Sequence, residues 1–429
     1  MLAALVLLLA VGGWYLLQGL REPEYEGKPV SYWFKEYCRS GQKMGWDPDR
    51  REEATAALQQ IGTNAIPYLL RQAFDNRPDS AFATEVYRVL NGLPRPRGVP
   101  PFVSSGVRLE EAGFLLKEIK PPASQLLPPL ERRLNSRNLM ERRQAIFILG
   151  GTGEGAEQAV PWLCSALKSP DHWEQVLALQ SLRWIGPKAH AAVPDLINLI
   201  KESPVTNRLR ISAALALGAI GSNAAPALPL VQEVFAQETN WNLRCSIAGA
   251  LGRIDAGQTE ALAFLIDGLT NHEPASERWM ALSPLGEIGP GAKAAVPVLL
   301  AALDGTNDML FSQIPRGLKA IGVPAETYLP LMKKKLRSSD ETTRVNAAAR
   351  VLDSDPADHD AHLVLIDVIK KESLFQGYAM QSLGHAGPAA SEAIPALREV
   401  VKTRSREREV ALKALKRIET KPRQSKPEY

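Results

Sequence analysis

Arginine returns at one fixed place along most of this 429-residue chain, eleven residues before each of six predicted turns. A guanidinium group binds carboxylates and phosphates through paired N–H donors. If the repeating arginines lined one groove, they would bind an acidic partner or a phosphate backbone. The ladder consists of Arg51, Arg142, Arg210, Arg244, Arg278 and Arg344.

Two tryptophans occupy equivalent positions in two of the predicted repeats. Trp173 and Trp241 precede equivalent predicted helices, and tryptophan is favoured at binding hot spots. The alternative is that both side chains pack under a neighbouring turn. The candidate partner-binding residues are therefore Arg142, Arg210, Arg244, Arg278, Arg344, Trp173 and Trp241.

Residues suited to catalysis or metal binding are few. His359 and His362 stand three apart in the segment DHDAH, but a structural zinc needs four converging donors and no other region supplies a matching set. A polar turn between helices is the favoured interpretation. Cys38, Cys164 and Cys245 lie far apart and form no CxxC pair. The sequence also lacks a P-loop, an HExxH motif and a GxSxG motif, so we expect no catalytic residue, metal or cofactor.

The elements that position these residues follow a repeat of 33 to 35 residues. An Ile-Gly pair is followed, after about eight residues, by a short apolar segment that contains proline. Self-similarity at this period predicts a stacked solenoid, because one unit cannot bury its apolar face without a neighbour. The pattern occurs at Ile185-Gly186 with Val193-Pro194, Ile220-Gly221 with Leu228-Pro229, Ile288-Gly289 with Val296-Pro297, and Ile321-Gly322 with Leu329-Pro330.

Each unit is predicted to contain two helices. Residues 210–221, RISAALALGAIG, read as an alanine-rich helix whose small side chains let neighbouring helices approach closely. Gly221 would end this helix in the left-handed conformation, and the next proline would lie in the first turn of the following helix. Residues 91–108 are rich in Pro, Gly and Ser and predict a loop inserted in the array.

These residues resemble HEAT-like repeats, including the shorter class first noted in bilin lyases. The resemblance covers most of residues 50–418 and implies an all-α solenoid superhelix of helical hairpins. It also implies a structural role for the arginine ladder, which would bridge turns and acidic groups of adjacent units. We favour this role over the groove because repetition of the fold already predicts it. The residues in register are Arg278, Ala281, Leu285, Gly286, Ile288, Gly289, Ala292, Val296, Pro297 and Leu299; the departures are Asp255 in place of the turn glycine, and a unit at 342–356 that ends in LDSDP.

The first twenty residues carry no charged side chain. As a helix they would reach about 30 Å, the thickness of the hydrocarbon core of a bilayer. We interpret residues 1–20 as a transmembrane anchor, with a cleaved signal peptide as the alternative. Basic residues after the span favour a cytoplasmic body, but acidic residues are interspersed, and we interpret the body as extracytoplasmic. Residues 27–37, GKPVSYWFKEY, resemble the segment after the anchor in bacterial membrane-attached HEAT proteins.

The C-terminus holds the excess positive charge of the chain. Residues 401–429 contain ten Lys and Arg against four Glu. Residues 419–429 have no apolar periodicity and are predicted to be disordered. This basic tail could bind anionic lipid or nucleic acid, although a solvated final helix is the favoured interpretation.

The sequence thus predicts four parts: an anchor or signal at 1–20, a linker and N-terminal cap at 21–48, a HEAT-like solenoid at 49–418, and a tail at 419–429. We expect a membrane-attached, non-enzymatic scaffold that binds a protein or peptide on the concave face of the solenoid. The alternatives are an enzyme of the bilin-lyase or DNA-glycosylase kind, and binding of nucleic acid or anionic lipid by the ladder and tail. A small-molecule ligand is not expected.

Overall fold

The structure, a computed structural model, divides into two compact units, Met1–Gln237 (unit 1) and Glu238–Tyr429 (unit 2). The sequence predicted one array over 49–418, and the division inside it was not anticipated. The predicted anchor at 1–20, most of the predicted loop at 91–108 and residues 420–429 of the tail lie outside the described residues. The structure describes residues 22–40, 48–75, 105–203, 208–305, 309–371, 373–403 and 407–419.

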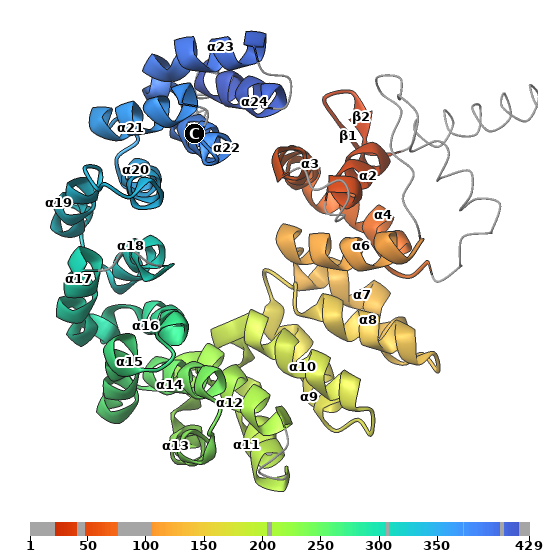
Figure 1. Cartoon of the computed structure of the whole chain (residues 1–429). Helices are drawn as coiled ribbons and strands as arrows, with labels where there is room; N and C mark the ends of the chain where they lie inside the picture. The colour runs from red at the N-terminus through yellow and green to blue at the C-terminus, as the bar shows by residue number, and fades with distance from the viewer. Residues whose placement is uncertain are drawn as a thin grey trace, which may run out of the picture. The chain divides into compact units, whose positions relative to one another are not determined.

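The described residues of unit 1 form helices and one short hairpin (Figure 1). Its elements are β1 (Glu24–Tyr25), β2 (Lys28–Pro29), α2 (Val30–Ser40), α3 (Pro48–Ile61), η1 (Gly62–Ala65), α4 (Ile66–Ala73), α6 (Ser105–Ile119), α7 (Ala123–Leu134), α8 (Leu139–Leu149), η2 (Ala156–Ala159), α9 (Val160–Leu167), α10 (His172–Ile185), η3 (Gly186–Ala192), α11 (Val193–Glu202), α12 (Arg208–Ile220), η4 (Gly221–Ala227) and α13 (Leu228–Gln237), where η marks a 3₁₀ helix.

The described residues of unit 2 form helices only. Its elements are α14 (Trp241–Ile254), α15 (Thr259–Asn271), η5 (Ala275–Ala281), α16 (Leu282–Ile288), η6 (Gly289–Ala295), α17 (Val296–Gly305), α18 (Met309–Ile321), α19 (Ala325–Lys335), α20 (Glu341–Ser354), α21 (His359–Lys370), α22 (Gln376–Ala386), η7 (Gly387–Ala393), α23 (Ile394–Thr403) and α24 (Arg408–Glu419).

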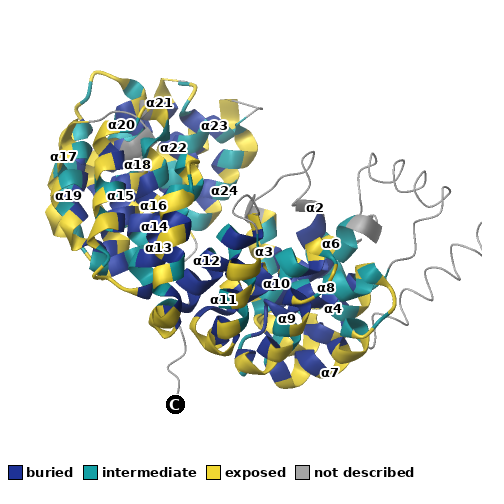
Figure 2. Cartoon of the chain, turned by 90° about the horizontal axis from the view of Figure 1, so that it is seen from below, coloured by how far each residue is buried: buried dark blue, intermediate teal, exposed yellow. Residues whose placement is uncertain are grey.

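Each unit stacks its helices in two layers. In unit 1, α6, α8, α10 and α12 pack side by side, and in unit 2 the helices α14, α16, α18, α20, α22 and α24 do the same; we call these the even layers. The odd-numbered helices from α7 onward form the second layer. Dark, buried residues run between the layers in Figure 2. Small buried residues such as Ala213, Ala216 and Gly218 of α12 allow the close helix packing of the even layer.

The Ile-Gly pair ends a helix by a sharp turn. Gly186 has φ 66° and ψ −133°, and Gly289 has φ 67° and ψ −134°. The predicted positive φ is therefore present, but ψ differs from the left-handed helical value that the sequence suggested. This region mirrors the β conformation and is readily open only to glycine. A 3₁₀ helix follows, and Pro194 then lies in the first turn of α11, where its missing N–H has no intrahelical acceptor.

Two units that lack this glycine use an aspartate turn instead. Asp255 is extended, with φ −147° and ψ 114°, and its Oδ1 accepts a hydrogen bond of 2.9 Å from the backbone N–H of Gly257. Asp355 repeats the arrangement with the backbone N–H of Ala357, at 3.3 Å. A carboxylate that accepts from the backbone two residues on replaces a backbone turn, which accounts for both departures from the repeat.

Residues 22–40 cover the first helices of unit 1. The sequence predicted a polar linker and an N-terminal cap here; in the structure the linker residues include β1 and β2, which form an antiparallel pair in which Glu24 lies opposite Pro29. Helix α2 then packs against α3 and α6. Val30, Trp33, Phe34 and Tyr37, which lie within the predicted cap, are all buried.

Two boundaries differ from expectation. Helix α6 begins at Ser105, so the last four residues of the predicted loop are helical. In unit 2, the repeat pattern that begins at Arg278 predicts an α-helix, but Arg278 lies in the 3₁₀ helix η5, and α16 begins only at Leu282. Pro284 explains the change, because within a longer helix it would remove a hydrogen bond and clash with the carbonyl four residues earlier.

One stretch of the described residues, Arg208–Gln237, is long and apolar enough to cross a membrane, and its apolar window is 50% buried. It comprises α12, η4 and α13, which are the two helices of a repeat and the turn between them. Its apolar side chains fill the core of unit 1, so its composition follows from packing.

Candidate functional site

Three ladder arginines donate to the carbonyl that lies six residues earlier in their own turn. The distance is 2.8 Å from Arg142 to the oxygen of Ser136, 2.9 Å from Arg278 to that of His272, and 2.7 Å from Arg344 to that of Ser338. These carbonyls lie in the turn that leads into the arginine's own helix. The arginine therefore closes its own hairpin, which is a structural use of the side chain.

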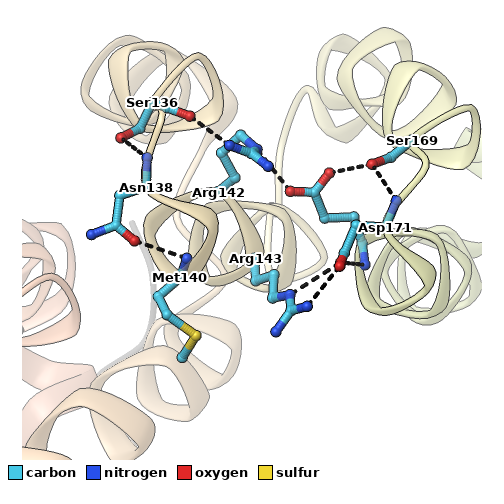
Figure 3. Close-up of polar contacts among 8 residues, drawn as sticks. Ser136, Asn138, Met140, Arg142, Arg143, Ser169 and Asp171 are labelled. Atoms are coloured by element: carbon cyan, nitrogen blue, oxygen red, sulfur yellow. Dashed lines mark hydrogen bonds and ion pairs between the residues drawn. The ribbon is translucent and has the colours of Figure 1, made fainter.

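Arg142 also joins two units (Figure 3). Its Nε donates to Oε1 of Glu174 on α10 at 2.7 Å, and the Ser169 hydroxyl donates to the other carboxylate oxygen at 2.6 Å. Glu174 is 5% exposed, so this carboxylate is buried, whereas its partners Arg142 and Ser169 are half-buried. Beside it, Arg143 binds Asp171 through two hydrogen bonds of 2.7 and 3.1 Å. These bonds hold the pKa of Asp171 below its usual value.

Asp171 has a second role as the cap of α10. Its Oδ1 accepts from the backbone N–H of Glu174 at 2.9 Å, and its own N–H donates to the Ser169 hydroxyl at 3.1 Å. Such a cap satisfies backbone donors that the first turn of a helix leaves open. Asn138 and Asp340 repeat both contacts at α8 and α20. The unit motif is thus Ser, any residue, Asn or Asp, and four residues later an arginine (Arg142, Arg344) or a glutamine (Gln175).

The remaining ladder arginines are also engaged within the chain. Arg210 is buried and donates to Glu233 at 2.7 Å, which lowers the pKa of Glu233. The guanidinium carbon of Arg244 lies 4.5 Å from the ring centroid of Phe264. Arg51 pairs with Glu111 at 2.9 Å. The groove role of the ladder stays a prediction, and the observed contacts serve the fold.

Two glutamines take the arginine's place in units where the ladder is interrupted. Gln175 donates to the carbonyl of Leu167 at 3.1 Å, and Gln376 donates to that of Ile369 at 3.2 Å. Sequence reasoning missed both because it followed arginine alone. The Ser-x-Asp motif at 169–171 would have identified Gln175, which lies four residues after its aspartate.

The two candidate tryptophans differ in exposure. Trp173 is 59% exposed at the start of α10. Trp241 is half-buried, because its ring stacks on His272 with centroids 3.8 Å apart and its Nε1 donates to the carbonyl of Glu277 at 3.5 Å. Trp241 therefore packs against the turn after α15, which was the alternative interpretation.

A cluster of aromatic rings that sequence reasoning missed crosses the even layer of unit 1. Phe114 of α6, Phe147 of α8 and Trp184 of α10 form two edge-to-face contacts, with centroids 5.2 and 5.7 Å apart. Phe114 is 40% exposed and Trp184 is 48% exposed. Consecutive helices of one layer thus present a continuous aromatic surface, which we call the aromatic stripe.

Lys117 lies inside the aromatic stripe. Its Nζ is 3.1 Å from the ring centroid of Phe147 and 3.0 Å from that of Trp184. This atom is buried and has no hydrogen-bond partner among the described residues. Burial lowers the pKa of Lys117 to about 6.

The two histidines singled out in the sequence share one carboxylate. His362 is buried, with Nδ1 2.6 Å from Glu392 Oε1 and Nε2 3.0 Å from the carbonyl of Pro356. His359 Nδ1 lies 2.9 Å from Glu392 Oε2. Burial raises the pKa of Glu392, but the histidine contacts outweigh this and hold it below its usual value. The cluster joins α21 to η7, and no group of three or more His, Cys, Asp or Glu in the described part of the chain could hold a metal ion.

Two family models match the sequence: HEAT repeats over residues 127–218, and PBS lyase HEAT-like repeat over residues 209–236. The chain is a HEAT-like repeat protein. The ladder arginines Arg142 and Arg210 fall within these matched HEAT-like repeats.

Solved structures similar to this HEAT-like repeat protein include an engineered protein and importin beta. The engineered protein is 20% identical, with 80% of this chain and 100% of that chain covered and a TM-score of 0.31. Importin beta is 12% identical, with 90% of this chain and 62% of that chain covered and a TM-score of 0.40. No curated protein matches the sequence. The function is therefore inferred from the surface of this chain.

Proposed function

We propose that the protein is a non-enzymatic scaffold whose even layer in unit 1 binds another protein or an extended peptide. The observation that carries this proposal is the aromatic stripe, in which consecutive repeats expose large rings. Aromatic side chains supply much of the binding energy at protein interfaces because they bury a large area with little loss of conformational freedom. Trp173, at the start of α10, offers a further exposed ring on the same layer.

The thiols and carboxylates of the described residues support a non-enzymatic role. Burial raises the pKa of Cys164 and of Cys245 to about 12, which keeps both thiols protonated and unreactive. The resolved pKa shifts of carboxylates are all downward, as at Asp171, Glu233 and Asp304, whereas a general acid in a groove would need a raised value.

We further propose that residues 1–20 attach the scaffold to a membrane, with the body on the extracytoplasmic side. The uncharged length of this segment supports the attachment. Tethering would keep the binding surface near the membrane and raise its effective concentration toward partners held in the same bilayer.

Site-specific photocrosslinking in cells tests the scaffold. A photoreactive amino acid replaces Trp184 or Trp173 in unit 1, and in a control it replaces Leu363, which is 48% exposed on α21 of unit 2. We expect discrete protein adducts at positions 173 and 184 and none of the same mass at 363. A Phe114→Ala substitution in the Trp173 probe protein should remove the adduct. Adducts that are absent from unit 1, or that persist unchanged with Phe114→Ala, would contradict the proposal.

A further inference from the structure

Two glycines in the turn after α8, Gly150 and Gly151, border the site of Lys117, which we call its seat. A Cβ on Gly151 would lie 2.6 Å from both Cα and Cγ of Lys117, and a Cβ on Gly150 would lie 2.7 Å from Cε3 of Trp184. Any other residue would push the lysine stem and the indole ring apart. The sequence Gly150-Gly151 therefore specifies the approach of Lys117, Phe147 and Trp184.

The seat offers the amine no charge partner. Burial is the resolved cause of the lowered pKa of Lys117, and no carboxylate of the described chain contributes to it. The faces of Phe147 and Trp184 attract an ammonium and offset part of the desolvation cost. Because no nearby anion offsets the rest of the desolvation cost, the pKa of Lys117 is lowered. At neutral pH the amine then carries a lone pair.

We propose that Lys117 is a nucleophilic amine that captures a neutral aromatic aldehyde as a Schiff base, with the aldehyde's ring lying against Trp184 and Phe114. A desolvated lysine in an apolar site is the usual form of an imine-forming amine. The nitrogen adds to the carbonyl carbon to give a carbinolamine. This species then loses its oxygen and the two amine hydrogens as one water molecule, and a C=N bond remains.

The chemistry of the seat selects the ligand class. Phe114 and Trp184, the rings at either end of the aromatic stripe, are partly exposed, and rotation of these side chains would give a flat molecule access to Nζ. Aromatic rings favour edge-to-face or offset contact with a further ring. The unpaired Nζ adds no anion or cation to which a charged ligand group could bind, so an uncharged aldehyde fits best.

Reductive trapping on the full chain tests the proposal. The protein is treated with benzaldehyde and cyanoborohydride from pH 5 to pH 9, and the benzylated lysines are quantified by peptide mass spectrometry. Lys120, exposed at the end of the same helix, is the internal reference. We expect Lys117 to react at least about tenfold faster than Lys120 at pH 7, because an ordinary lysine is almost fully protonated there. Its rate should reach a plateau near pH 7 while that of Lys120 still rises.

Two variants keep the test independent of folding failure. Trp184→Leu retains the amine but opens its seat, so the preference for Lys117 over Lys120 should fall while the helical circular dichroism persists. Lys117→Met should remove the labelled peptide and leave all others unchanged. Faster labelling of the exposed Lys120 than of Lys117 at every pH would overturn the proposal. A Lys117 rate that keeps rising to pH 9 would do so as well.

Discussion

Arg142 donates hydrogen bonds both to its own hairpin and to the next unit, and these two contacts explain why an arginine recurs at its position. One end of the guanidinium closes the turn at Ser136, and the other neutralises the buried Glu174 of the next unit. A lysine could supply the charge but not the divergent N–H donors. The N–H donors of Arg142 that would bind a partner in a groove are therefore already engaged in contacts within the fold.

Arg142→Ala is expected to lower the free energy of unfolding by about 2–4 kcal/mol, because it leaves a buried carboxylate without its charged donor. Urea denaturation followed by circular dichroism measures the change. Arg143→Ala is the matched control, since Asp171 keeps its capping contact and the loss should be smaller. Unchanged stability in Arg142→Ala, together with lost partner crosslinks, would instead assign the arginine to the binding surface.

Lys117→Met is expected to stabilise the protein at pH 7 by about 1–2 kcal/mol, since the buried amine must lose its proton on folding and an apolar side chain carries no such cost. The pKa of this amine falls from 10.5 to about 6 on folding, so between these values the unfolded chain binds more protons. The stability of the unsubstituted protein must therefore rise with pH through this window, and the advantage of methionine must shrink toward pH 10. Denaturant midpoints at pH 7 and pH 10 measure this. An advantage independent of pH would contradict it.

At the scale of elements, the position that ends a helix requires glycine, because other residues do not readily adopt its backbone conformation. Gly289→Ala is expected to cost about 1–3 kcal/mol, because alanine cannot adopt this φ and ψ without strain. Gly377→Ala in α22 is the control: it has no positive φ and no atom within 4 Å of the added Cβ, so it should stabilise by about 0.5–1 kcal/mol. Both changes can be read from thermal unfolding. Equal effects at the two positions would refute the conformational argument.

Sequence periodicity predicted the helical hairpins because the Ile-Gly pair and the following proline are local signals. The aromatic stripe escaped prediction because Phe147 and Trp184 are 37 residues apart, which is out of register with the repeat. They meet only because Gly150 gives the indole room, and sequence alone does not reveal such a contact. The half-buried position of Trp241 likewise depends on its stacking on His272, a contact that the sequence does not reveal.

At the scale of the whole molecule, the chain has two compact units where the repeat predicted one array. Repetition specifies how one hairpin follows another, but it does not indicate where the contacts between hairpins become sparse. Each unit contains its own buried core.

Deletion of residues 1–20 is therefore expected to give a soluble protein with unchanged helical circular dichroism and an unchanged thermal midpoint. The full-length chain, prepared in parallel, should need detergent for extraction from membranes. A truncated chain that aggregates or loses helicity would mean that the segment belongs to the fold. Full-length protein recovered without detergent would rule out the anchor.

The hydrogen bond from an arginine to the carbonyl six residues before it begins and ends within one hairpin. A duplicated hairpin would carry its own copy of this closure, together with its own serine and cap. Such a chain can gain or lose whole hairpins during evolution without new residues being required at the junction. An insertion between the carbonyl and its arginine would break this bond, so length changes of one or two residues should fall elsewhere in the hairpin, as the range of 33 to 35 residues per repeat already shows.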